Sequence, residues 1–176
     1  MDATNSIAFS CLDTSLGLLM VAGTPEGICF AEFGDDPGTL REHLQKEFPK
    51  ARLVPAEDSH SPQLSTWLSA LDQHLSHNQP RPDLPLDLRG TDFQTRVWKL
   101  LLSVREGEVV SYTELARRLG EPKAVRAVAS ACGRNRIAVL IPCHRVLRSD
   151  GSLGGYRWGL ERKQQLLARE RSVPTE

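Results

Sequence analysis

The start of the chain alternates short apolar runs with turn-forming residues. Apolar residues concentrate in 7–12, 17–22 and 28–33, and the segment 24–27 (Thr-Pro-Glu-Gly) separates the last two runs. Short apolar runs bounded by Pro and Gly are typical of strands joined by tight turns. The pattern therefore predicts a small antiparallel sheet in this part of the chain.

Two helical patterns follow the predicted sheet. The first is the four-residue spacing of Leu40, Leu44 and Phe48. The second and stronger pattern comprises Leu64, Trp67, Leu68, Leu71 and Leu75. Apolar residues spaced three and four apart lie on one face of a helix, so each pattern predicts an amphipathic helix.

Residues 77–89 contain three prolines, Pro80, Pro82 and Pro85. A segment of this kind is extended and often joins two domains. We therefore expect an N-terminal α/β domain with its linker over 1–88 and a second domain over 89–176.

The second half begins with helix signals. Thr91 and Gln94 fit a capping box, as do Ser111 and Glu114 further along. The apolar stripe of the first of these helices comprises Phe93, Val97, Leu100 and Leu101. The second ends at Gly120, and a third is expected from Lys123 to about Gly133. Two helices joined by a short glycine-containing turn indicate a helix-turn-helix.

The third predicted helix has two different faces. Val125, Val128 and Cys132 share one face and should be core. The other face carries small residues between basic ones: Arg126, Ala127, Ser130 and Arg134. Such a face could enter a DNA minor groove, which is about 6 Å wide. Packing against another helix explains the small residues equally well.

Composition describes an ordinary globular protein, with 40% hydrophobic and 25% charged residues. No apolar run approaches the length of a membrane span, and residues 1–9 do not resemble a signal peptide. We therefore expect a cytoplasmic protein with no membrane partner. The four cysteines are scattered, so disulfides are not expected.

The zero net charge hides an asymmetry between the halves. Residues 1–90 carry 6 Lys/Arg against 13 Asp/Glu, a net charge of −7, whereas 91–176 carry 16 against 9, a net charge of +7. The segment 117–148 holds eight basic residues and a single acid. Such a segment is a candidate polyanion-binding surface, although a solvated basic face is the commoner explanation.

The segment 141–146 reads Ile-Pro-Cys-His-Arg-Val and carries the candidate chemistry. A thiol needs help to react at neutral pH, because its ordinary pKa is about 8.5 and the thiolate is the nucleophile. His144 is a candidate base for Cys143, and Arg145 and Arg148 supply positive charge. Glu170 falls near the leucine face of the predicted C-terminal helix and could orient His144. A solvated Glu170 is the alternative.

These motifs together resemble the O6-alkylguanine-DNA alkyltransferases. The resemblance rests on 141–146, on Asn135 eight residues before Cys143, on 123–132 (Lys-Ala-Val-Arg-Ala-Val-Ala-Ser-Ala-Cys) and on 155–159 (Gly-Tyr-Arg-Trp-Gly). It is dense after residue 90 and weak before it, and within the family it is nearest to the C-terminal domain of Ada-type regulators.

The resemblance implies an α+β fold. A small ribonuclease-H-like N-terminal α/β domain precedes a helical, winged-helix-like domain with a helix-turn-helix, whose recognition helix enters the minor groove. The implied activity is a single-turnover transfer of an alkyl group from O6-alkylguanine, and from O4-alkylthymine, in double-stranded DNA to the protein. A monomer without cofactor is expected, because the protein itself is the acceptor.

The resemblance also assigns roles. Cys143 is the nucleophile, His144 takes its proton through a water, Glu170 orients His144, Asn135 holds the turn and Tyr112 hydrogen-bonds the base. The implied substrate-binding residues are Arg145, Val146, Leu147, Gly154, Gly155, Tyr156 and Trp158, with Trp158 narrowing the mouth. The implied DNA-binding residues are Thr95, Lys123, Arg126, Ala127, Ser130 and Arg134, with Arg126 filling the gap left by the flipped base.

Some relatives bind zinc through Cys and His in the N-terminal domain. Cys11 and Cys29 lack such a His pair, so we expect no metal. Three other functions compete: a non-catalytic alkyltransferase-like damage-binding protein, a helix-turn-helix regulator and a cysteine hydrolase. The presence of Cys143 disfavours the first, and the small-residue helix face disfavours the second. Adjacent Cys and His side chains usually point apart, which disfavours the third.

Overall fold

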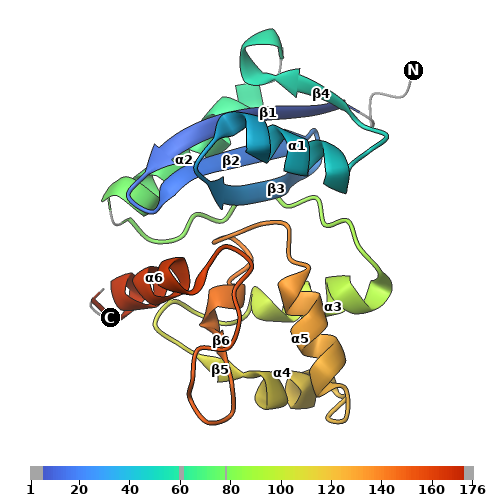
Figure 1. The fold of residues 1–176 in the computed structure, drawn as a ribbon, viewed down its shortest axis with the longest axis vertical. Coiled ribbons are helices and arrows are strands. Elements are labelled where there is room, and N and C mark those ends of the chain that lie inside the picture. The colour runs from blue at the N-terminus through green and yellow to red at the C-terminus, as the bar shows by residue number, and fades with distance from the viewer. Residues whose placement is uncertain (1–5, 60–61, 78, 173–176) are drawn as a thin grey trace. The chain divides into compact units, whose positions relative to one another are not determined.

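A computed structural model describes residues 6–59, 62–77 and 79–172. The chain divides into two units, Met1–Leu88 and Arg89–Glu176. Both α-helices and β-strands are present, so the α+β class is confirmed at this level (Figure 1). No helix in the described ranges is long and apolar enough to cross a membrane.

The first unit is built on a four-stranded sheet. Three strands, β1 (Ser6–Thr14), β2 (Gly17–Thr24) and β3 (Gly27–Gly34), form the antiparallel arrangement that the apolar runs predict. A fourth strand, β4 (Arg52–Pro55), pairs in parallel with β1 and gives the order β3-β2-β1-β4. The sequence analysis missed β4, because this segment is short and mostly half-buried.

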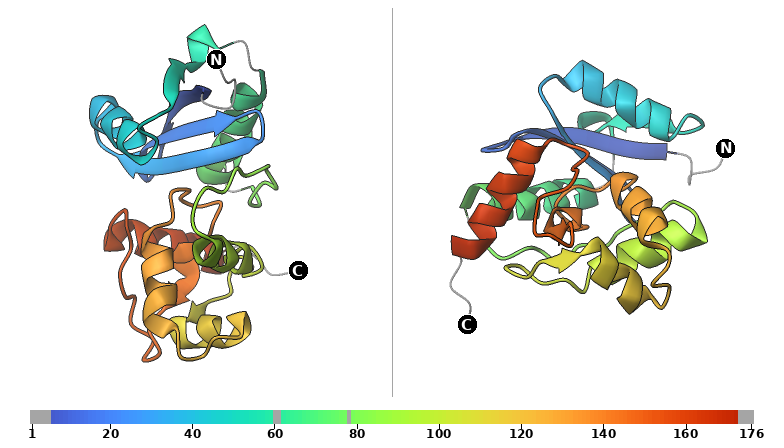
Figure 2. Two further views of the ribbon diagram at one scale, coloured as in Figure 1. Left: turned by 90° about the vertical axis from the view of Figure 1, so that its right-hand side faces the viewer. Right: turned by 60° about the horizontal axis from the view of Figure 1, so that its bottom comes forward.

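Two helices, α1 (Pro37–Glu47) and α2 (Pro62–His77), cover opposite faces of this sheet (Figures 1 and 2). Because side chains alternate along a strand, Met20 and Ala22 point to the face where Leu40 and Leu44 of α1 pack. Gly23 points the other way, and a Cβ on it would lie 2.7 Å from the Trp67 ring of α2. A 3-10 turn, η2 (Ala56–Asp58), follows β4.

The proline-rich segment is extended, as expected, but it is also tied to the sheet. The Ile28 N–H donates to Pro85 O at 2.9 Å, and the Asp87 N–H donates to Ile28 O at 2.8 Å. The buried Asp87 carboxylate also accepts from the Thr24 hydroxyl at 2.6 Å. Gly27 has a φ of +148°, and a Cβ there would lie 2.6 Å from the Pro85 backbone. Only glycine permits this approach.

The described residues of the second unit form four helices: α3 (Asp92–Leu101), α4 (Tyr112–Leu119), α5 (Val125–Gly133) and α6 (Leu160–Ser172). Helices α3, α4 and α5 pack on one another, and the Trp98 indole N–H of α3 donates to Ala131 O of α5 at 2.9 Å. Two short strands, β5 (Val110–Ser111) and β6 (Val146–Leu147), pair in parallel. A 3-10 turn, η3 (Cys143–Arg145), precedes β6.

The predicted helix starts in this unit agree with the structure, except for the second capping box and the first residue of α5. Both hydrogen bonds of the first capping box are present: the Thr91 side chain accepts from the Gln94 N–H, and the Gln94 side chain accepts from the Thr91 N–H. Ser111 accepts from the Glu114 N–H, but the Glu114 side chain pairs with arginines of its own helix instead of completing the second box. Helix α5 begins at Val125, later than the expected Lys123.

Candidate active site

The site is organised by a buried turn between α5 and η3. Asn135 is fully buried, and its side-chain amide reaches three acceptors. Nδ2 donates to Ile137 O at 3.2 Å, to Ile141 O at 3.1 Å and to Cys143 Sγ at 3.2 Å. Oδ1 accepts from the Ile137 N–H at 2.9 Å. One amide therefore fixes both ends of the turn and the thiol.

The turn has a strained backbone. Val139 has a φ of +72° and, among the described residues, is the one non-glycine residue with positive φ. This conformation is a genuine outlier for a β-branched residue and costs about 1–3 kcal/mol. Val139 lies between Ile137 and Ile141, whose carbonyls the Asn135 amide holds. The buried amide thus helps to hold a backbone conformation that Val139 alone would avoid.

Cys143 begins the η3 turn, and its side chain is buried. Burial raises the pKa of the thiol to about 11, although the Asn135 hydrogen bond and the nearby charges of Lys163 and Arg157 act in the opposite direction. The resting thiol is therefore protonated at neutral pH. A base must remove its proton for Cys143 to act as a nucleophile.

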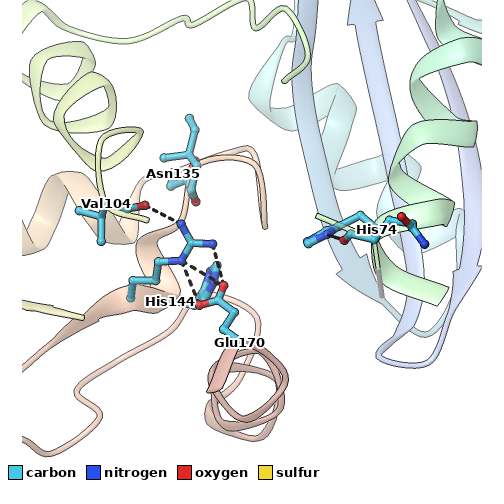
Figure 3. Close-up of polar contacts among 8 residues, drawn as sticks. His74, Val104, Asn135, His144 and Glu170 are labelled. Carbon is cyan, nitrogen blue, oxygen red and sulfur yellow. Dashed lines mark hydrogen bonds and ion pairs between the residues drawn. The ribbon is translucent and has the colours of Figure 1, made fainter. Parts of the chain in front are cut away.

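His144 and Glu170 form a buried pair that can supply this base (Figure 3). His144 Nε2 lies 2.6 Å from Glu170 Oε1. Burial opposes ionisation of Glu170, yet hydrogen bonds from His144 and Arg145 hold its pKa at about 2. Because an ionised carboxylate only accepts, Nε2 must carry the proton in this pair.

This arrangement leaves His144 Nδ1 with a free lone pair. Burial lowers the pKa of His144, and the Glu170 hydrogen bond only partly offsets that effect. The imidazole is therefore neutral. Within the described part of the chain, Nδ1 has no hydrogen-bond partner. A neutral imidazole oriented by a carboxylate is the arrangement expected of a general base.

Arg145 completes the buried cluster in a way that the sequence analysis did not anticipate. Its Nε lies 3.0 Å from each Glu170 oxygen, its Nη2 donates to Oε1 at 2.8 Å, and its Nη1 donates to Val104 O at 2.6 Å. The guanidinium therefore neutralises Glu170. The Arg145 backbone N–H is also engaged, with Pro142 O. That backbone groups of 145–147 read the base stays a prediction.

A cavity of about 330 Å³ opens beside the thiol. It is lined by Tyr112, Ala129, Cys132, Gly133, Cys143, Arg148, Gly155, Tyr156 and Arg157. Four of the expected residues, Tyr112, Cys143, Gly155 and Tyr156, therefore meet at one place. Burial raises the pKa of the Tyr112 phenol to about 12, so this group keeps its proton at neutral pH and can donate a hydrogen bond.

Other expected substrate residues do not line the cavity. Gly154, with a φ of +68°, packs against the Tyr112 ring. Val146 is buried on β6, and Leu147 is half-buried beside it. Trp158 is buried, and its ring contacts that of Tyr156 edge-on, with centroids 5.3 Å apart. Trp158 does not line the cavity, and its narrowing of the mouth stays a prediction.

The expected DNA-contacting residues lie on or near α5. Arg126, Ala127 and Ser130 are exposed on one face of this helix, while Val128 and Cys132 are buried on the other. The two faces of the helix thus match the sequence pattern. Three further candidates lie outside it: Arg134 is exposed at its C-cap, Lys123 is exposed before its start, and the half-buried Thr95 on α3 donates to Asp92 O.

Lys163 is the main site residue that the sequence analysis missed. It is fully buried on α6, and its ammonium donates to Val146 O at 2.7 Å, to Gly155 O at 3.0 Å and to Leu153 O. It thereby ties the cavity loop to β6. A signal was available, because Lys163 precedes Leu166, Leu167 and Glu170 by three, four and seven residues and so shares their face.

Comparison with known proteins supports the resemblance. The family model described as the DNA-binding domain of 6-O-methylguanine DNA methyltransferase matches residues 92–172. A methylated-DNA–protein-cysteine methyltransferase from Mycolicibacterium paratuberculosis is 54% identical over 165 residues, covering 94% of this chain and 93% of that protein. The bifunctional transcriptional activator/DNA repair enzyme Ada of Escherichia coli is 47% identical over 165 residues.

The chain covers 46% of the length of Ada, so it spans about half of that relative. Among solved structures, Mycobacterium tuberculosis OGT in complex with DNA matches with a TM-score of 0.76 and 36% identity, covering 95% of this chain and 93% of that one. The same fold and a relative matched over nearly its whole length settle the classification. The chain belongs to the family of methylated-DNA–protein-cysteine methyltransferases.

Proposed function

We propose that this protein repairs DNA by moving a methyl or other alkyl group from O6 of guanine, and from O4 of thymine, to Cys143 Sγ. The observation that carries the proposal is the cavity beside Cys143, whose thiol is held by Asn135 and followed by the His144–Glu170 pair. Relatives named methylated-DNA–protein-cysteine methyltransferase support it.

The transfer is a displacement at the alkyl carbon. His144 Nδ1 takes the thiol proton through a water, and Glu170 stabilises the imidazolium that forms. The Sγ–carbon bond forms as the carbon–O6 bond breaks, while the Tyr112 phenol donates a hydrogen bond to the departing base. The proton that His144 took from the thiol returns through solvent to that base. The sulfur supplies the electron pair of the new Sγ–carbon bond, so the transfer needs no cofactor. The product is a stable thioether, so each molecule acts once.

We propose that residues 89–176 are the DNA-binding and catalytic domain, with α4 and α5 as a helix-turn-helix in a winged-helix-like arrangement. The exposed small residues of α5 enter the minor groove, and Arg126 replaces the extruded base in the stack. Arg134, Lys123 and Thr95 contact the sugar-phosphate backbone of the DNA. The solved structure of a relative with DNA supports this assignment.

Residues 1–88 form a domain that we assign to the ribonuclease-H-like folds, because a mixed sheet is covered by helices on both faces. We propose that the protein works as a monomer in the cytoplasm. The four cysteines are all free in the structure, which suits a reducing compartment.

Replacing the nucleophile tests the proposed function. Cys143→Ala should abolish loss of O6-methylguanine from a duplex oligonucleotide, yet bind that duplex with nearly unchanged affinity, because phosphate contacts dominate affinity. Cys132→Ala is the matched control, since Cys132 lines the same cavity and should leave the reaction in place. Methyl transfer by Cys143→Ala would show that another group is the acceptor.

Arg126→Ala tests base extrusion separately from the chemistry. Repair of duplex DNA should slow, whereas reaction with free O6-alkylguanine base should not, because the free base needs no extrusion. Single-turnover rates on both substrates measure this. Equal losses on the two substrates would place Arg126 in the support of the cavity instead.

A further inference from the structure

Two arginines, Arg148 and Arg157, line the cavity beside Cys143, and the proposed methyl transfer uses neither. They belong to different parts of its wall. The Arg148 stem lies beside Tyr112, since a Cβ on Gly154 would lie 3.4 Å from Arg148 Cγ and 3.3 Å from the Tyr112 ring. Arg148 therefore belongs to the wall that carries Tyr112.

Arg157 belongs to the wall that carries the thiol. Its Nη1 donates to Asn135 O at 3.0 Å, and the side-chain amide of Asn135 lies 3.2 Å from Cys143 Sγ. Its guanidinium also lies 5.8 Å from the centre of the Trp158 ring. Two contacts thus hold the guanidinium at this wall. The Arg157 charge also acts to lower the Cys143 pKa, which requires it to be within electrostatic reach of the sulfur.

The chemistry fixes where the substituent of an alkylated base must lie. The carbon attached to O6 has to meet Sγ in line with the breaking bond, so any group attached to that carbon lies within a few ångströms of the sulfur. A methyl group gains nothing from a guanidinium there. A carboxylate would be repelled by the sulfur as the thiolate forms, unless a cation offsets the repulsion.

We propose that Arg157 equips this protein for O6-alkylguanine adducts whose alkyl group ends in a carboxylate, of which O6-carboxymethylguanine is the smallest. The inference rests on the proposed alkyl transfer. The guanidinium pairs with the carboxylate and turns it from the attacking sulfur, as its planar donor pattern suits. Sγ bonds to the methylene carbon, the carbon–O6 bond breaks, the base recovers through solvent the proton that His144 took from the thiol, and S-carboxymethylcysteine remains.

The test compares three duplexes that carry O6-methyl-, O6-carboxymethyl- or O6-carbamoylmethylguanine at the same position. The carbamoyl group matches the carboxylate in size but has no charge, so the ratio of the two single-turnover rate constants isolates the charge. Arg157→Gln should lower the carboxymethyl-to-carbamoylmethyl ratio by roughly threefold or more, as expected for a partly exposed ion pair. Arg157→Lys should retain most of the ratio.

Arg148→Gln is the matched control, since it removes the other cation of the same cavity, at the Tyr112 wall. It should change the ratio less than Arg157→Gln does. An unchanged ratio in Arg157→Gln, or an equal loss on all three duplexes, would overturn the inference and assign Arg157 to the support of Asn135. Failure of the unaltered protein on the methyl duplex would instead overturn the proposed function.

Discussion

Both units of this protein bury apolar side chains, but the second also buries a group of charged ones around its site. In the first, α1 and the sheet enclose an apolar cluster that includes Phe30, Leu40 and Leu44. In the second, several polar side chains are buried near one thiol: Asn135, His144, Arg145, Lys163 and Glu170. The first arrangement stabilises a fold by hydrophobic burial alone. The second must also satisfy every buried charge, which ties the stability of the unit to the geometry of its site.

Removing one member of the polar set should produce the largest loss. Arg145→Met leaves the Glu170 carboxylate buried without its main cationic partner and should cost about 3–5 kcal/mol of unfolding free energy. Chemical denaturation measures this loss. The double variant Arg145→Met/Glu170→Gln is the control, because it removes the uncompensated charge and should recover part of the stability. A double variant as unstable as the single one would mean that Arg145 acts through packing.

An apolar deletion in the first unit should separate stability from activity. Leu44→Ala should cost about 2–5 kcal/mol, because a fully buried side chain leaves a cavity. The rate of methyl transfer by folded molecules should remain that of the unaltered protein. Denaturation curves and single-turnover rates well below the melting temperature test both points. A slower methyl transfer under conditions where the variant is fully folded would show that the apolar cluster of the first unit also affects the site.

The polar set should also make stability sensitive to acid. Glu170 has a pKa of about 2 in the folded protein against an ordinary value of 4.5, so it binds protons more readily when unfolded. Its contribution is fully present above about pH 4.5 and is lost as the pH falls towards 2, by roughly 3 kcal/mol. Unfolding free energies across this range should fall less steeply in Glu170→Gln. Identical slopes would exclude Glu170 as a source of the acid sensitivity.

The smallest effect is expected where the second unit depends on local structure alone. Thr91 caps α3 and exchanges hydrogen bonds with Gln94 on an exposed surface. Thr91→Ala should cost about 1 kcal/mol and leave methyl transfer unchanged. Melting temperatures and transfer rates measure both. A change in rate larger than the change in stability would connect the cap to the site.

The contrast between the units also explains what the sequence could predict. Local patterns identified three strands, the α1 and α2 stripes and the two faces of α5, because hydrophobic periodicity reports directly on burial. Strand β4 was missed, since its parallel pairing with β1 joins segments that are distant in the chain. No local signal records such a pairing.

The site was predictable only in part. The Pro-Cys-His-Arg motif and the resemblance drew attention to Cys143, His144 and Glu170. The buried partners of two charged neighbours were missed, because they come from other segments: Arg145 binds Glu170 and Val104 O, and Lys163 binds three carbonyls. A charged residue looks solvated in a sequence until the acceptors that surround it are known.

The most direct test of the proposed alkyl transfer is the intact mass of the protein after mixing with a duplex that contains O6-methylguanine. We expect a gain of one methyl group per molecule, no further gain with excess DNA, and a modified peptide that contains Cys143. An unchanged mass with an unrepaired duplex, or a methyl group on a different residue, would contradict it.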